Sequence, residues 1–118
     1  MVVLVNEIRD RYGEPPLRRS TSLSDSSRRF ASWLMRRGYF GHRARISVAD
    51  GFLEAGETLA IHGGRQPLVR DTVRRWMRST PHRAVLLSER FRWIGVGRSW
   101  GKFGERPSTI WVAQLAIR

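Results

Sequence analysis

The chain has 118 residues, 41% of them hydrophobic and 27% charged, which is the composition of a single globular domain over residues 1–118. No apolar run approaches the ~20 residues that cross a bilayer, and the absence of cysteine excludes a disulfide scaffold, a cysteine nucleophile and a thiolate metal site. Lysine and arginine total 22 against 10 acidic residues, and the formal charge of +12 predicts attraction to anionic surfaces or polymers.

The positive charge has two explanations that the sequence does not separate. All cations except Lys102 are arginines, and they are scattered along the chain in pairs such as 18–19, 28–29 and 36–37. Scattered arginines are typical of a solvated surface that keeps a protein soluble. The same residues would serve a polyanion-binding module, which we keep as an alternative function.

The first expected element is a helix that begins almost at the first residue. Leu4, Val5, Ile8 and Tyr12 recur at helical spacing, and Gly13 followed by two prolines ends the pattern. The opening MVVLV is too short for the apolar core of a signal peptide and has neither a basic leader nor a cleavage site. We therefore expect a cytoplasmic protein or a mature domain whose leader has been removed.

A second helix is expected from Ser22, where a sequence resembling a capping box begins, to about Gly38. A shorter amphipathic segment follows around Val48, Phe52 and Leu53 and closes at Gly56. A strand is expected at residues 57–62, and the two glycines that follow end it. The apolar stripe of the second helix consists of Leu23, Phe30, Ala31, Leu34 and Met35.

The second half of the chain predicts one more helix and two strands. Pro67 suits the first turn of a helix that Pro81 ends, and a short helical turn is expected at 84–87. Strands are expected at 93–96 and 110–117, separated by a loop rich in glycine and charge. Because helices come first and most strands last, the sequence predicts an α+β fold with an antiparallel sheet between helical layers.

The candidates for chemistry are two histidines at the ends of helices and one acidic residue. His42 follows the second helix, His82 follows the Pro67 helix, and Glu57 opens the first predicted strand. Two imidazoles and a carboxylate can hold zinc, or they can work as a general acid–base pair. The spacing alone does not show that they meet. The remaining histidine, His62, is expected to be structural or exposed.

Ser79 lies three residues before His82, so a nucleophilic serine activated by histidine is a further candidate. No glycine-elbow sequence surrounds it. The other interpretation, which we expect, is a serine that caps the end of its helix where Pro81 follows.

A second candidate region is the loop between the last two predicted strands. Arg98, Trp100, Lys102 and Phe103 could form a basic, aromatic surface that stacks on bases or sugars. The alternative is a mobile hairpin tip without a ligand.

Seven fragments of the chain, taken in order, resemble one family. They lie at residues 5–9, 16–17, 38–42, 56–60, 76–87, 91–97 and 111–115. This order and spacing resembles the CAP superfamily of cysteine-rich secretory proteins, venom antigens and plant pathogenesis-related proteins, and above all its short, cysteine-free bacterial members.

The resemblance implies a three-layer α-β-α sandwich with a central antiparallel sheet. It also implies a shallow cavity in which two histidines and two acidic residues converge and can hold a divalent metal such as zinc. His42, His82 and Glu57 stand at the matching positions. Ser79 replaces the second acid, so one carboxylate is missing, and we expect a weaker hold on the metal.

The function implied by the resemblance is an extracellular-type binding domain, secreted or at the cell surface, with a small lipid or peptide as a conceivable ligand. An alternative from another class is a hydrolase in the same cavity, with His82 as general base and Glu57 as its orienting carboxylate.

Overall fold

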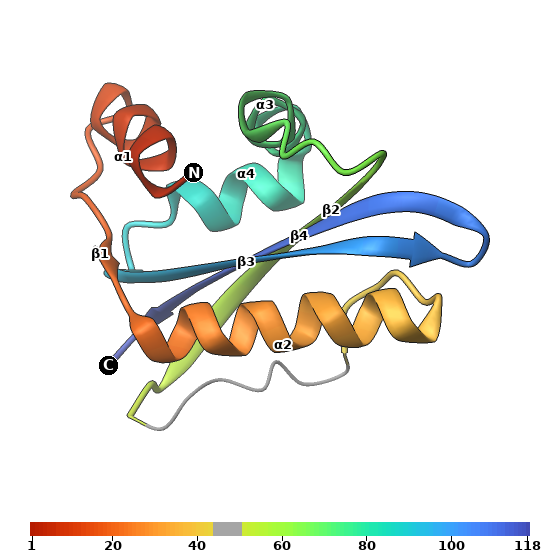
Figure 1. Ribbon diagram of the computed structural model, residues 1–118. Helices are drawn as coiled ribbons and strands as arrows, with labels where there is room; N and C mark the ends of the chain where they lie inside the picture. The colour runs from red at the N-terminus through yellow and green to blue at the C-terminus, as the bar shows by residue number, and fades with distance from the viewer. Residues whose placement is uncertain (44–50) are drawn as a thin grey trace.

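The computed structural model describes residues 1–43 and 51–118. Figure 1 shows the elements in chain order, and their bounds are as follows: α1 (Val2–Arg11), β1 (Arg18–Arg19), α2 (Thr21–Arg37), β2 (Glu54–Gly63), α3 (Val69–Arg78), α4 (Thr80–Leu87), β3 (Trp93–Phe103) and β4 (Arg106–Ile117). Within the described residues, none of these helices has the length and apolar character that crossing a membrane requires.

The sheet lies between two helical layers, with α2 on one face and α1, α3 and α4 on the other (Figure 1). Each face has its own cluster of buried side chains, one shared with α2 and one shared with the other three helices. This arrangement confirms the α+β class and the helices on both faces.

The prediction of a purely antiparallel sheet was wrong in one respect. The strand order is β1-β3-β4-β2, and the three long strands are antiparallel, but β1 pairs with β3 in parallel. The two residues of β1 are too few to leave a hydrophobic pattern in the sequence. Because α2, β2, α3 and α4 separate β1 from β3 in the chain, no hairpin forces the two strands to run in opposite directions. The sheet is therefore mixed.

Helix α2 forms where the apolar stripe predicts it. Its N-cap is Ser20, whose Oγ accepts a hydrogen bond from the backbone of Leu23 at 3.2 Å. Its C-cap is Gly38, which has a left-handed backbone (φ 60°) that a residue with a side chain seldom adopts. The start lies one residue before the predicted Ser22, because Ser20 rather than Ser22 supplies the capping oxygen.

Between α2 and α3 the structure differs from the prediction. The predicted amphipathic segment falls partly outside the described residues, since Val48 lies in 44–50, while Phe52 and Leu53 are described and are not helical. Gly56 does not close an element but lies inside β2, which begins at Glu54. A Cβ on Gly56 would come within 2.9 Å of the Phe91 ring, so the glycine reflects packing rather than a chain break.

Two further boundaries were wrong for a common reason. Pro81 does not end a helix: α3 ends at Arg78, and Pro81 lies in the first turn of α4, which covers far more than the predicted turn at 84–87. The predicted loop between the last strands belongs instead to a long hairpin, β3 and β4. In both cases proline and glycine were interpreted as breaks, although their backbones fit the element that surrounds them.

Candidate functional site

The site is built on β2, which is an edge strand of the sheet. Its side chains alternate, so Glu57 points to the same face as Leu59 and Ile61, which pack in the cluster beneath α2. Gln114 of β4 lies directly opposite Glu57 in the pairing of the two strands. The sheet therefore carries a carboxylate and an amide side by side on its α2 face.

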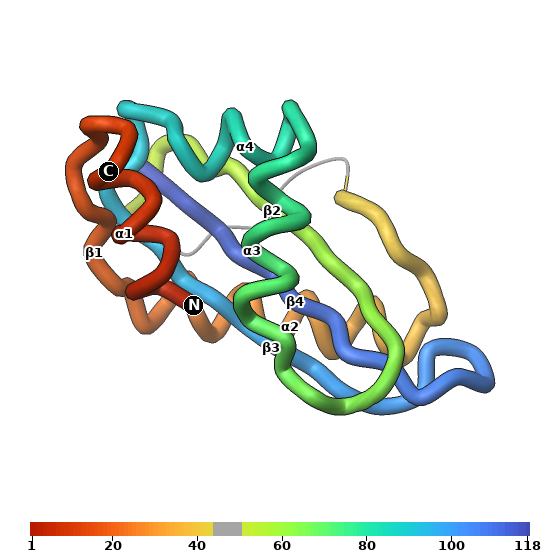
Figure 2. The backbone as a smooth tube through the Cα atoms, turned by 90° about the horizontal axis from the view of Figure 1, so that it is seen from above, coloured from red at the N-terminus to blue at the C-terminus, as the bar shows by residue number. Residues whose placement is uncertain are grey.

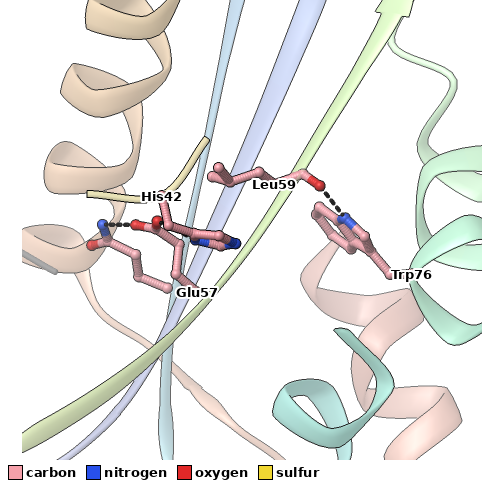
Figure 3. A network of polar contacts seen from close by, with 5 residues as sticks. His42, Glu57, Leu59 and Trp76 are labelled. Atoms are coloured by element: carbon pink, nitrogen blue, oxygen red, sulfur yellow. Dashed lines mark hydrogen bonds and ion pairs between the residues drawn. The ribbon is translucent and has the colours of Figure 1, made fainter. Parts of the chain in front are cut away.

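Glu57 is a buried carboxylate held by two neighbours. Its Oε1 lies 3.0 Å from His42 Nδ1, and its Oε2 accepts a hydrogen bond from Gln114 Nε2 at 3.0 Å. The Glu57 side chain is only 3% exposed, whereas that of His42 is 48% exposed. Figure 3 shows the imidazole of His42 against Glu57. Glu57 is thus fixed by the sheet, and the imidazole of His42 faces solvent.

This contact decides which ring nitrogen of His42 is available. An ionised carboxylate can only accept hydrogen bonds, so the proton in this bond is carried by His42 Nδ1, which donates to Glu57 Oε1. When the imidazole is neutral, Nε2 then has a free lone pair. The arrangement is the one by which a second-shell carboxylate orients a metal-binding or proton-transferring histidine.

His82 comes from the other helical layer, in the first half of α4, and is half-buried. Burial lowers the pKa of His82 below its ordinary value of 6.5, and the positive charges of His42 and Arg75 lower this pKa further. Because a charge on His42 acts on this pKa, we expect the two imidazoles to lie near each other. A histidine of this kind is neutral near pH 7, with one nitrogen free to accept a proton or bind a ligand.

The position of α3, and with it that of α4, depends on contacts with the free edge of β2. Trp76 Nε1 donates to the Leu59 carbonyl at 2.9 Å (Figure 3), and an Arg75 amino group donates to the Ile61 carbonyl at 3.1 Å. These carbonyls would otherwise be unpaired at the sheet edge. The two side chains cover the edge and hold α3 beside β2.

The structure does not gather all the predicted site residues into one cluster. Within residues 1–43 and 51–118, no three His, Cys, Asp or Glu side chains lie close enough to share a metal ion. Glu57 pairs with His42, not with His82 as the hydrolase hypothesis required. Among the described residues, His62 bonds to two backbone oxygens, those of Gly63 and Pro67.

Ser79 adopts the capping position without the capping hydrogen bond. It is both the last cap of α3 and the N-cap of α4, with an extended backbone. In the described part of the chain its hydroxyl bonds neither to the first turn of α4 nor to His82. The expected position at a helix end is therefore confirmed, and among the described residues no hydrogen bond joins the Ser79 hydroxyl to a base.

Gln114 is the site residue that sequence reasoning missed. It is 2% exposed, and its Oε1 is one of two buried side-chain atoms, with Thr58 Oγ1, that have no hydrogen-bond partner in the described residues. The signal was present, because Gln114 is the one polar side chain in the apolar run 110–117. A buried amide is costly unless it is bonded, and its bond to Glu57 gives the reason for keeping it.

We expect His42→Ala to raise the pKa of His82, because the substitution removes a positive charge that opposes protonation. Arg74→Ala is the control, since it removes a cation adjacent to Arg75 that does not act on His82. Both can be followed by NMR from the Hε1 shift of His82 against pH. An unchanged pKa in His42→Ala would contradict the proximity of the two histidines.

The same shift predicts how stability changes with pH. The unfolded chain takes up the His82 proton near pH 6.5, whereas the folded chain takes it up only at lower pH. Acidification below about pH 6.5 should therefore lower the free energy of unfolding through this group, and above that pH the contribution disappears. His82→Asn should remove this part of the acid sensitivity in urea unfolding.

Comparison with known proteins gives one family over most of the chain. The model described as "Cysteine-rich secretory protein family" (CAP) matches residues 2–115. A curated relative, the uncharacterized protein YkwD of Bacillus subtilis, is 31% identical over 106 residues, which are 82% of this chain and 40% of that protein. The chain thus spans well under half the length of this relative.

Solved structures agree with the family match. An outer surface protein from Borrelia burgdorferi superposes with a TM-score of 0.81 at 18% identity, over 99% of this chain and 89% of that one. An extracellular protein containing an SCP domain from Bacillus anthracis superposes with a TM-score of 0.77 at 24% identity, over 98% of this chain and 38% of that one. At such identities the likeness establishes the fold alone.

Proposed function

The chain belongs to the cysteine-rich secretory protein family, and we propose that it is a binding domain of the extracellular kind whose ligand-contacting groups are His42 and His82. Glu57 acts behind them as the residue that orients His42. The names of two matched structures describe an extracellular protein and an outer surface protein, which supports action outside the cell.

The observation that carries this proposal is the hydrogen bond between His42 Nδ1 and the buried Glu57 Oε1. A carboxylate that is 3% exposed and has no arginine or lysine partner within the described residues is an expensive group to bury. Gln114 and His42 together satisfy it, and the consequence is an imidazole with a fixed tautomer at the surface. Such an arrangement is typical of a binding site.

A zinc-like ion fits the two imidazoles better than it fits the set of three side chains. Both carboxylate oxygens of Glu57 already accept hydrogen bonds, so Glu57 is suited to the second shell. His42 Nε2 and the neutral ring of His82 would be the protein ligands, and zinc prefers such nitrogens. With two protein ligands instead of three or four, the affinity should be modest. A bound ion would supply a positive centre for an anionic or carbonyl ligand.

The test is a zinc titration by calorimetry near pH 7.5, after chelator treatment. We expect one site in the wild type, and we expect it to disappear in both His42→Ala and His82→Ala. Glu57→Gln should weaken binding by about 10- to 100-fold without abolishing it, as expected for an orienting group. His62→Ala is the matched control and should bind zinc as the wild type does.

Acidification gives a second readout of the same site. Because zinc competes with protons for imidazole nitrogen, binding should weaken as the pH falls through the range in which the histidines protonate. Zinc binding that survives the loss of both histidines, or that is absent from the wild type, would overturn the metal part of the proposal. In the second case His42 and His82 would have to act on a ligand directly.

A further inference from the structure

The β3–β4 hairpin extends beyond the helices that cover the rest of the sheet (Figures 1 and 2). Its strands are paired as far as Phe103 and Arg106, so the end of the hairpin is regular structure and not a loose loop. Side chains of β3 alternate between the two faces at this end. The two faces therefore have to be considered separately.

One face of the hairpin end packs against the core beneath α2. Phe103 packs against the apolar cluster beneath α2, and Gly101 faces the same way, since a Cβ there would lie 3.5 Å from Met35 Cγ. Phe103 is therefore not part of the exposed aromatic surface that the sequence suggested. Arg98, Trp100 and Lys102 belong to the opposite face, which α3 leaves uncovered toward the tip.

Trp100 is an exposed aromatic ring held in place by an arginine. It is 52% exposed, and the Arg65 guanidinium lies over its ring at 4.3 Å from the centroid. The loop that carries Arg65 is attached to the hairpin by two hydrogen bonds: Gly64 N donates to the Pro107 carbonyl at 2.8 Å, and Thr109 Oγ1 donates to the Gly64 carbonyl at 2.8 Å. Arg65 thus lies over one face of the indole, and about half of the residue stays exposed to solvent.

Cations stand on both sides of this ring. Arg98 lies two residues before Trp100 and is placed on this face by its contact with the Trp111 ring at 5.9 Å. Lys102 lies two residues after it and is exposed. Neighbours on one face of a strand are about 7 Å apart, so the cations form a row with the indole in the middle. Over residues 93–117 the sequence has one acidic residue, Glu105.

We propose that this face, defined as Arg65, Arg98, Trp100 and Lys102 and here called the hairpin platform, binds an acidic polysaccharide. A sugar ring stacks by its apolar face on the exposed part of Trp100, as apolar groups generally pack on an indole. Anionic groups of the sugars before and after it meet Arg98 and Lys102, where charge-assisted hydrogen bonds are stronger than neutral ones.

The arrangement favours a sugar polymer over a single-stranded nucleic acid. Nucleic-acid platforms stack successive bases on several aromatic rings. Of the large hydrophobic side chains of β3 and β4, Trp100 alone is exposed in the described structure. Trp100 between two cations offers one stacking position and two charge contacts, which suits a polymer that stacks a single sugar ring while the acidic groups of the neighbouring sugars meet the cations. The extracellular setting of the proposed function is compatible with this ligand but does not carry the inference.

The test uses a galacturonic acid octamer as the probe, with affinity measured by calorimetry at about 50 and about 200 mM salt. Trp100→Ala should weaken binding by about fivefold or more, since loss of a stacking ring costs about 1–3 kcal/mol. Trp100→Phe keeps an aromatic face and should retain most of the affinity. Arg98→Ala with Lys102→Ala should weaken binding and reduce its dependence on salt.

The control separates a defined platform from diffuse charge. Arg29→Ala with Arg36→Ala removes two exposed arginines of α2 and changes the net charge by the same amount. It should leave the affinity within about twofold of the wild type. Equal weakening by the two double variants, or no effect of Trp100→Ala in a protein with unchanged melting temperature, would overturn the proposal.

Two other probes define the ligand class. Inorganic polyphosphate has charge but no rings, so its binding should be insensitive to Trp100→Ala. A thymidine octamer that binds more tightly than the galacturonic acid octamer, and through Trp100, would overturn the polysaccharide assignment in favour of nucleic acid. His42→Ala should leave the platform unaffected, so the failure of the histidine site and the failure of this proposal are distinguishable.

Discussion

Arg9→Met is expected to destabilise the protein by at least about 3 kcal/mol, although Arg9 contacts no predicted functional residue. The side chain is 0% exposed within the fold. Burial lowers the pKa of its guanidinium from the usual range, and Arg92 lowers it further, while Glu14 partly offsets the effect. The group nevertheless stays protonated, because an arginine does not lose its proton in proteins.

The reason for the large effect is that Arg9 bonds to backbone carbonyls from three segments. Its Nε donates to Pro15 at 2.8 Å, one terminal nitrogen donates to Leu86 and Ser88 at 2.8 and 3.0 Å, and the other donates to Phe91 at 3.4 Å. Two of these carbonyls lie at the C-terminal end of α4, where a cation is favourable. Loss of the guanidinium would leave the buried Leu86 carbonyl and the partly buried Pro15 and Ser88 carbonyls without this donor, while the Phe91 carbonyl keeps a donor in Arg92. A buried carbonyl without a donor costs about 1–3 kcal/mol.

Urea unfolding of Arg9→Met beside Arg11→Met tests this prediction. Arg11 is exposed on the same helix, so its substitution should change the free energy of unfolding by about 0.5 kcal/mol or less. Arg9→Lys should fall close to Arg9→Met, because one ammonium cannot reach carbonyls that lie in three directions. If the two methionine variants unfold at the same urea concentration, the hydrogen bonds of the Arg9 guanidinium (the Arg9 clamp) contribute nothing to stability.

Gly97→Ala is the second substitution with a large expected effect, about 3 kcal/mol or more. A Cβ at this position would overlap the backbone of Arg28 and of Ser27, and one at Gly95 would overlap the backbone of Leu23 and Ser24. Backbone cannot move aside as the end of a side chain can. Helix α2 would have to lift from β3, which would loosen the cluster beneath it.

Gly101→Ala is the matched control for this prediction. Gly101 lies on the same strand and the same face, but its added Cβ would meet Met35 Cγ at 3.5 Å, an ordinary contact. We expect Gly101→Ala to change the free energy of unfolding by no more than about 1 kcal/mol. Alanine lowers the conformational entropy of the unfolded chain relative to glycine, and this effect stabilises the folded state. Thermal unfolding of the two alanine variants would compare them, and a Gly97→Ala protein as stable as Gly101→Ala would contradict the close approach of α2.

Sequence reasoning identified the residues of the candidate site but not how they pair. His42, Glu57 and His82 were found because their types and positions matched a known arrangement. The hydrolase alternative paired Glu57 with His82, whereas in the structure Glu57 contacts His42. Gln114 was missed, since nothing in the sequence says that it lies opposite Glu57. Strand pairing between residues that are 57 positions apart is set by the sheet, and local spacing cannot reveal it.

The sequence suggested the residue types of a basic, aromatic surface but not which residues share a face. The sequence suggested a basic, aromatic surface near residues 98–103. Strand alternation then separated Phe103 from Trp100, and the fold added Arg65 from a distant loop. The surface exists only because Gly64 is held on β4. The sequence pattern therefore indicated the residue types of the surface, and the tertiary contacts decided which residues belong to the hairpin platform.

The sequence by itself determined the α+β class, the core face of α2, the family and the residue types of the site, because helical periodicity, composition and ordered motifs are local properties of a chain. Only the tertiary structure decided the parallel pairing of β1, the clamp formed by Arg9 and the need for glycine at position 97. Each of these depends on backbone from a distant segment. A hydrogen bond or a close approach of that kind produces no periodic pattern in the sequence. Arg9 and Gly97 do lie in the fragments 5–9 and 91–97 that carry the family resemblance, but the fragments do not say what these residues contact.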